Sequence, residues 1–103
     1  MNAVARDIFR AIHEGKWLSI EYRNKGNEIT KYWIGIRSLD AARRTLKVDG
    51  LHLGQYKMKT LDYPIKIDSI LSSELIEGSY CDVNEALVRD IYLNPHKYNE
   101  LFD

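Results

Sequence analysis

The stretch from Lys16 to Leu39 reads KWLSIEYRNKGNEITKYWIGIRSL, and the rest of the chain is organised around it. Two halves flank the polar turn 24–27, which contains two asparagines and a glycine. In both halves apolar residues occupy every second position: Leu18, Ile20, Tyr22, Tyr32, Ile34 and Ile36. Alternation with period two, rich in Ile and Tyr and bounded by Asn and Gly, predicts a half-buried antiparallel hairpin. Trp33 then lies on the outward face or, with the register shifted by one residue, in the core.

Length and composition describe an ordinary globular chain. With 103 residues, 45% hydrophobic and 29% charged, we expect one domain, 1–103, with a modest core. Fifteen basic residues balance fifteen acidic ones, so net charge favours neither nucleic acid nor a membrane surface. No apolar run is long enough to span a bilayer, and the N-terminus lacks the order of a signal peptide. We therefore expect a cytoplasmic protein without a membrane partner.

The rest of the chain divides into short elements. Helical spacing of apolar residues predicts a helix over about 2–14, stopped by Gly15. After the polar loop 38–44, a third strand over 45–48 should turn at Asp49-Gly50, a type I′ signal, into a strand containing Leu51 and Leu53. Residues 54–63 lack periodicity and are expected to be a loop. A strand over 65–67 and a last strand ending near Ile76 follow.

The C-terminal part is helical. Asp82 and Glu85 have the spacing of a capping box, with Asp82 as the N-cap. Asn94-Pro95 should start a short further turn. A helix at 2–14, a barrel over about 16–77 and a helical segment over about 82–102 indicate an α+β, mainly β fold. Short strands avoid bare edges by closing, so we expect a small SH3/Sm-like antiparallel β-barrel of about five strands.

The sequence shows no catalytic residues, and none that would bind a metal or cofactor. His13, His52 and His96 lie far apart, without the spacing of a zinc site. The glycines do not form a phosphate-binding loop. Cys81 precedes the predicted C-terminal helix, whose N-terminus would lower the pKa of the thiol; the alternative is an unreactive, half-buried cysteine. We expect a protein that is not an enzyme.

Basic residues on the outward strand faces form the candidate binding site. A basic surface with an exposed aromatic ring binds single-stranded nucleic acid by phosphate attraction and base stacking. The candidates are Arg23, Lys31, Trp33, Arg37, Arg43, Arg44, Lys47 and Lys66. The alternative is a solvated strand face with no ligand. A second hypothesis is a protein-interaction or dimerisation module, whose aromatic and apolar anchors would be Tyr98, Leu101 and Phe102.

Three blocks of the chain resemble the WYL domain, an Sm-like barrel found mainly in bacterial regulators. The first is Leu18-Ser-Ile-Glu-Tyr22, which resembles that family's aliphatic and tyrosine pattern in its first strand. The second is Ile34-Gly-Ile-Arg-Ser-Leu39, with Ile36 where the family has proline. The third is Ile65-Lys-Ile-Asp-Ser-Ile70. The blocks follow one another in the family's order over about residues 11–80.

The resemblance also has departures. The Trp-Tyr-Leu triplet that names the family falls at Arg44-Thr45-Leu46, and the arginine of its third block falls at Ser69. In the family these residues line the ligand-binding face. The resemblance implies a non-catalytic module that senses or holds a nucleic acid or a nucleotide. It also implies the N-terminal domain of a larger bacterial nucleic-acid-handling protein such as a helicase.

Overall fold

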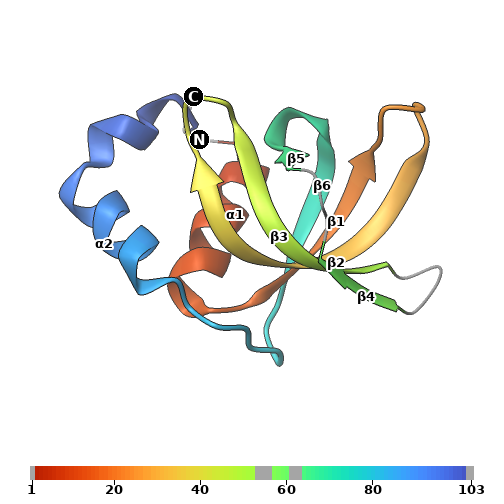
Figure 1. The fold of residues 1–103 in the computed structure, drawn as a ribbon, viewed down its shortest axis with the longest axis horizontal. Helices are drawn as coiled ribbons and strands as arrows, with labels where there is room; N and C mark the ends of the chain where they lie inside the picture. Colours follow the sequence, from red (N-terminus) through yellow and green to blue (C-terminus); the bar gives the residue numbers. More distant parts are fainter. Residues whose placement is uncertain (1, 53–56, 61–63, 102–103) are drawn as a thin grey trace.

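The computed structural model describes residues 2–52, 57–60 and 64–101 (Figure 1). Two helices and two shorter 3₁₀ segments, η1 and η2, accompany the strands. In chain order the elements are α1 (Ala3–Glu14), β1 (Trp17–Arg23), β2 (Ile29–Asp40), β3 (Thr45–His52), β4 (Lys57–Thr60), β5 (Ile65–Lys66), η1 (Ile67–Ser69), β6 (Ile70–Ile76), α2 (Glu85–Leu93) and η2 (Pro95–Leu101).

The strands form one antiparallel sheet. Hydrogen-bonded neighbours follow the order β4-β3-β2-β1-β6, and the two-residue β5 pairs with β3 beside this path. Figure 1 shows β2 and β3 bending strongly, so that the sheet curls around the core. This is the predicted α+β, mainly β fold: a small SH3/Sm-like barrel with an N-terminal helix and a C-terminal helical segment. No helix among the described residues is long and apolar enough to cross a membrane.

The predicted hairpin and its register are confirmed. Leu18 lies opposite Ile34, and both side chains are fully buried. Trp33 lies opposite Ser19 on one side and Leu51 on the other, is half-buried, and does not belong to the core cluster. The alternate positions of the hairpin that include Ile34 therefore point inward, and Trp33 lies on the other face.

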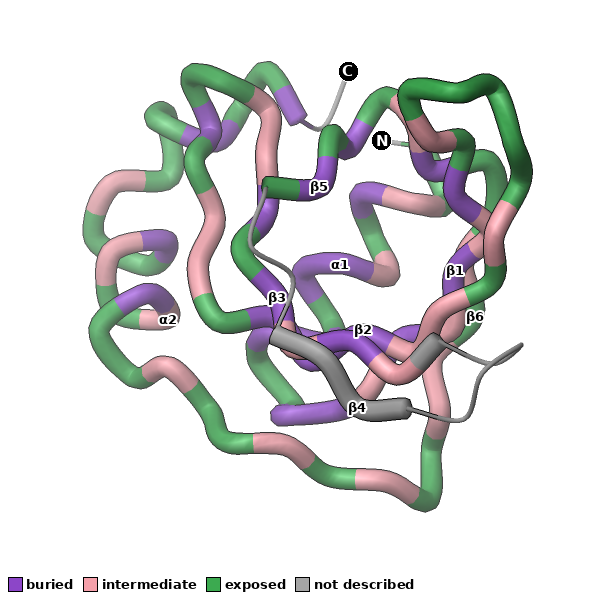
Figure 2. The backbone as a smooth tube through the Cα atoms, turned by 45° about the vertical axis from the view of Figure 1, so that its right-hand side comes forward, coloured by how far each residue is buried: buried purple, intermediate pink, exposed green. Residues whose placement is uncertain are grey.

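Helix α1 covers the sheet with an amphipathic face. The Asn2 side chain caps it by accepting a hydrogen bond from the Ala5 N–H at 2.8 Å. Gly15 ends it in the left-handed region, with φ 63°. Ile8 and Ile12 are buried where α1 packs against β6 and β1, as the purple positions of Figure 2 show for the inner side of the helix. The predicted helix is confirmed to within one residue.

Strand β3 corrects two predictions. Asp49-Gly50 does not turn: β3 continues through both residues, with Asp49 opposite Gly35 and Gly50 opposite Ile34. Part of the predicted loop 54–63 is strand β4, which pairs with β3. Pairing on both sides of β3 supplies backbone hydrogen bonds that outweigh the local turn preference. Leu53 lies outside the described residues.

The polar loop predicted at 38–44 begins later in the structure than predicted. Strand β2 runs on to Asp40, and the turn occupies only 41–44. The register shifts between Ile36 and Ser38, so Arg37 is the extra residue of a β-bulge on β2 and has no partner position on β3. The strand predicted at 65–67 ends at Lys66, and Ile67 begins η1.

The C-terminal cap lies two residues later than predicted. Asn84, not Asp82, is the N-cap of α2, and its Oδ1 accepts from the Leu87 N–H at 3.1 Å. The same side chain donates from Nδ2 to the Arg37 carbonyl at 2.6 Å, a contact between distant segments that the capping pattern does not contain. Leu87 and Ile91 are buried against the barrel core.

Candidate nucleic-acid interface

One groove collects cations from two segments that are far apart in the sequence. It lies between the tip of the β1–β2 hairpin and the start of β3, β5 and η1, and has a volume of about 580 Å³. We call it the hairpin groove. Its lining residues are Tyr22, Arg23, Asn24, Lys25, Gly26, Thr45, Pro64, Lys66 and Ser69. Three of these are cationic, one is a threonine and one a serine, and none of the described lining residues is acidic.

Local structure places the residues that carry these cations. Asn27 adopts φ 63° in the hairpin turn, and its Oδ1 accepts a hydrogen bond from the Arg23 guanidinium at 2.8 Å. The same turn exposes Lys25. Lys66 on β5 lies directly opposite Thr45 on β3, which sets its position from the other side of the groove. The groove is thus a product of the turn and of the β3–β5 pairing.

A smaller groove of about 240 Å³ continues from the first. It shares Thr45 and Pro64 with the hairpin groove and adds Lys47 and Arg43. Asp40 is the one carboxylate on the described lining of the two grooves, and it lies 3.8 Å from the Arg43 guanidinium. We call the two grooves together the basic track. Its cations are Arg23, Lys25, Arg43, Lys47 and Lys66.

The track brings together only part of the predicted site. Four predicted residues line it: Arg23, Arg43, Lys47 and Lys66. Lys31 is exposed on β2 opposite Glu21 and lines neither groove. Trp33 also lines neither groove. Any stacking contribution from Trp33 would therefore lie away from the gathered cations.

Arg44 has a contact that explains its place in the turn. Its guanidinium makes hydrogen bonds of 2.9–3.1 Å to the Asp68 carboxylate, and another of 3.1 Å to the Glu100 carbonyl. The pairing raises the pKa of Arg44 and lowers that of Asp68. Arg44 adopts φ 54°, so its side chain leaves the turn toward η1 and η2 and joins them. It is engaged within the chain.

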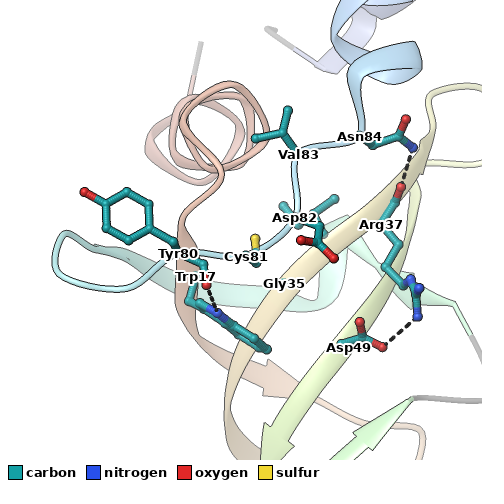
Figure 3. Close-up of a pocket in the computed structure, with 10 residues that line it drawn as sticks. Trp17, Gly35, Arg37, Asp49, Tyr80, Cys81, Asp82, Val83 and Asn84 are labelled. Atoms are coloured by element: carbon teal, nitrogen blue, oxygen red, sulfur yellow. Dashed lines mark hydrogen bonds and ion pairs between the residues drawn. The ribbon is translucent and has the colours of Figure 1, made fainter.

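Arg37 lies in a different groove, shown in Figure 3. Its guanidinium pairs with the Asp49 carboxylate at 3.1 Å. Cys81 lies in the same groove, and burial together with the carboxylates of Asp82 and Asp49 raises the pKa of its thiol. The alternative in which a helix N-terminus lowers this pKa is contradicted, because α2 begins only at Glu85. Among the described residues, no group of three potential ligands is suitable for a metal ion.

The predicted interface residues are mostly inside the protein. Tyr98 and Leu101 are each 2% exposed and belong to the core cluster. The Tyr98 ring meets Phe9 edge to face at 6.4 Å between centroids. Phe102 lies outside the described residues. The exposed large apolar residues of α2 are instead Tyr92 and Leu93, at 82% and 63%.

Sequence reasoning did not include Lys25, Thr45 and Ser69 among the site residues. Lys25 lies in the turn 24–27, where alternation gives no face, and only the fold brings that turn opposite β5. Thr45 and Ser69 occupy the positions at which the WYL resemblance departs from its family. Their short side chains leave room for the groove between the cations.

Comparison with known proteins adds no relative: no family model matches this chain, and no similar curated protein was found. The likeness to WYL domains therefore rests on the three sequence blocks. In the fold these blocks lie in β1, in β2, and from β5 through η1 to the first residue of β6.

Proposed function

We propose that this chain is a non-catalytic, WYL-like binding module that holds a nucleic acid or a nucleotide along the basic track. The observation that carries the proposal is the gathering of five cations on two adjoining grooves of a chain with no net charge. Phosphate groups are the abundant anions that a group of cations along adjoining grooves attracts. The hydroxyls of Thr45 and Ser69 are further hydrogen-bond donors for phosphate oxygens.

Phosphate contacts would then supply most of the affinity, because Trp33, the aromatic residue predicted to stack on a base, is half-buried and lies off the track. Tyr22, the one aromatic residue on the described lining of the track, is only 6% exposed. Binding should accordingly tolerate many sequences and depend steeply on salt. If all five cations contact phosphates of a single strand, the logarithm of affinity should fall with the logarithm of salt with a slope of about −3.5.

Fluorescence anisotropy with labelled single-stranded DNA and RNA tests the proposal. Titrations at several salt concentrations give the slope, and Lys66→Ala should make it shallower by about 0.7, the share of one cation on a single strand. Lys31→Ala is the matched control, since it removes the same charge from an exposed strand position off the track. Absence of salt-dependent binding, or equal effects of the two variants, would overturn the proposal.

The resemblance suggests where such a module works. We place it as the N-terminal domain of a larger bacterial, cytoplasmic protein that handles nucleic acid, such as a helicase. The track would hold a strand or a nucleotide while other domains carry out the chemistry. Gene context that joins the chain to a helicase or nuclease domain supports this assignment.

The second candidate is a protein-interaction or homodimerisation module. Tyr92 and Leu93 favour it, as neighbouring apolar side chains of α2 that are largely exposed. Light scattering over a range of concentrations tests it: a stable dimer that Tyr92→Ser dissociates supports this function. A monomer at every concentration removes homodimerisation. Tyr98→Ala is unsuitable for this test, because Tyr98 is part of the core.

A further inference from the structure

The groove of Figure 3 has a different character from the basic track. It has a volume of about 490 Å³ and lies between strands β2 and β3 and the extended segment 80–84, which we call the strap. Its described lining residues are Trp17, Gly35, Ile36, Arg37, Asp49, Tyr80, Cys81, Asp82, Val83 and Asn84. It shares no residue with either groove of the track.

Three hydrogen bonds fix the strap and so preform the groove. The Cys81 N–H donates to the Gly15 carbonyl at 2.7 Å. The Trp17 indole Nε1 donates to the Tyr80 carbonyl at 2.9 Å, and Asn84 donates to the Arg37 carbonyl. The floor is closely packed as well: a Cβ on Gly35 would lie 3.4 Å from Cys81 Cβ and 3.5 Å from the Trp17 ring.

The charges in this groove do not cancel. Asp49 already pairs with Arg37, which leaves the Asp82 carboxylate as the additional charge on the lining. Among the described residues Asp82 takes part in no ion pair, and it is exposed. Figure 3 shows its carboxylate pointing into the space between Trp17 and the Arg37–Asp49 pair.

We propose that this groove binds an arginine side chain of a partner peptide, with the guanidinium on the Asp82 carboxylate and against the Trp17 indole. A guanidinium is planar, forms paired hydrogen bonds with a carboxylate, and stacks on aromatic rings. Trp is the aromatic residue that attracts a cation most strongly. The groove offers both partners on a fixed frame, so little side-chain ordering is required on binding. This inference does not rest on the proposed nucleic-acid function.

The strap explains why the site requires the folded chain. Trp17 opens β1, whereas Asp82 follows β6 and is more than sixty residues away in sequence. The Trp17–Tyr80 hydrogen bond brings them to one groove. Asp82 does not cap α2, so its carboxylate has no assigned structural role among the described contacts. Replacing it should leave the fold intact.

An NMR titration of the ¹⁵N-labelled chain tests the site. The probe is an acetylated and amidated pentapeptide with a central arginine, and the control peptide carries citrulline, which keeps the planar group without the charge. The arginine peptide should shift the signals of the Trp17 indole N–H, the Gly35 amide and the Asn84 side-chain amide. The citrulline peptide should shift them far less.

Matched variants distinguish binding of the arginine peptide in this groove from its general attraction to negative charge on the surface. Asp82→Asn should weaken binding of the arginine peptide by about tenfold. Glu85→Gln removes an equal charge nearby, on the first residue of α2 and outside the groove lining, and should change affinity less than about twofold. Shifts scattered over the surface, equal losses in the two variants, or no shifts at millimolar peptide would each overturn the proposal.

Discussion

Asp90 is the residue on which the C-terminal segment converges. Its carboxylate accepts hydrogen bonds from the Tyr98 hydroxyl, from Lys97 Nζ at 2.9 Å and from Asn94 Nδ2 at 2.9 Å. Of these, the Tyr98 hydroxyl contributes most to lowering the pKa of Asp90 from 3.8 to about 2. In turn, burial and the Asp90 carboxylate raise the pKa of Tyr98 from 10.0 to about 12. One carboxylate thus ties α2 to η2.

These two pKa values predict opposite limbs of a stability profile. Because its pKa is lowered, Asp90 contributes to the free energy of unfolding fully above pH 3.8, and this contribution is lost as pH falls toward about 2. Because its pKa is raised, Tyr98 contributes to the free energy of unfolding fully below pH 10, and this contribution is lost as pH rises toward about 12. Urea unfolding midpoints against pH should show both losses. Asp90→Asn should remove the loss at low pH and only reduce the loss at high pH, because burial is the larger cause of the raised pKa of Tyr98. Limbs unchanged in that variant would contradict the assignment.

Gly15 gives a second prediction at the scale of one residue. It adopts φ 63°, and a Cβ there would lie 2.7 Å from Val83 Cγ2 and 3.0 Å from the Cys81 carbonyl oxygen. Gly15→Ala should therefore destabilise the protein by about 1–3 kcal/mol. Gly78→Ala is the matched control, because a Cβ there would meet nothing within 4 Å, and its φ is not positive. Chemical unfolding of both variants should separate them; equal stabilities would show that the strap yields to Gly15→Ala.

At the scale of elements, Arg44 joins the turn between β2 and β3 to η1 and η2. Its pair with Asp68 is bidentate, which favours strength, but the Asp68 side chain is 67% exposed and solvent screens the charge. A double-mutant cycle of Arg44→Ala and Asp68→Asn should give a coupling free energy of no more than about 1 kcal/mol. Arg44→Ala should cost more stability than Asp68→Asn, because it also removes the bond to the Glu100 carbonyl. The reverse order would show that this third contact contributes little.

The elements also show how far the sequence predicts this fold. The hairpin was predictable because its alternation is local and its inward face is entirely apolar, as with Ile34 and Ile36. The turn at Asp49-Gly50 was wrong because strands on both sides hold β3 extended. Asp82 was a plausible cap by spacing, but the bond from Asn84 to the Arg37 carbonyl is a tertiary contact. Pairing across long sequence separations decided each of these cases.

The same limit applies to the site. The alternation of apolar residues correctly predicted that Lys31 and Lys47 are exposed. It did not predict that Lys47 lines the basic track and Lys31 does not, because the bulge at Arg37 lies between the two pairing regions. Arg44 and Arg37 were expected to be available, and their carboxylate partners lie 24 and 12 residues away in sequence. A count of basic residues cannot reveal such partners. The fold does so by placing each charge beside its neighbours.

For the whole molecule, the arrangement of charge matters more than its sum. Fifteen positive and fifteen negative residues cancel, yet the described lining of the basic track carries five cations and one carboxylate. A local field of this kind acts over roughly 8 Å at physiological ionic strength, so distant carboxylates do not neutralise it. Nucleic-acid affinity should therefore follow the position of a charge rather than the net charge.

Two charge reversals test this directly. Lys66→Glu and Lys31→Glu both change the net charge from zero to −2, and both sites are exposed strand positions where the fold should tolerate glutamate. Lys66 lies on the track, so its reversal should lower affinity for single-stranded DNA by at least about tenfold and flatten the salt slope. Lys31→Glu should change affinity only a few-fold, because that charge lies beside Glu21 and off the track. Anisotropy titrations at matched salt provide the comparison, with circular dichroism to verify that both variants are folded. If the two reversals weaken binding equally, the protein attracts nucleic acid through its overall charge, and the basic track is not the binding site.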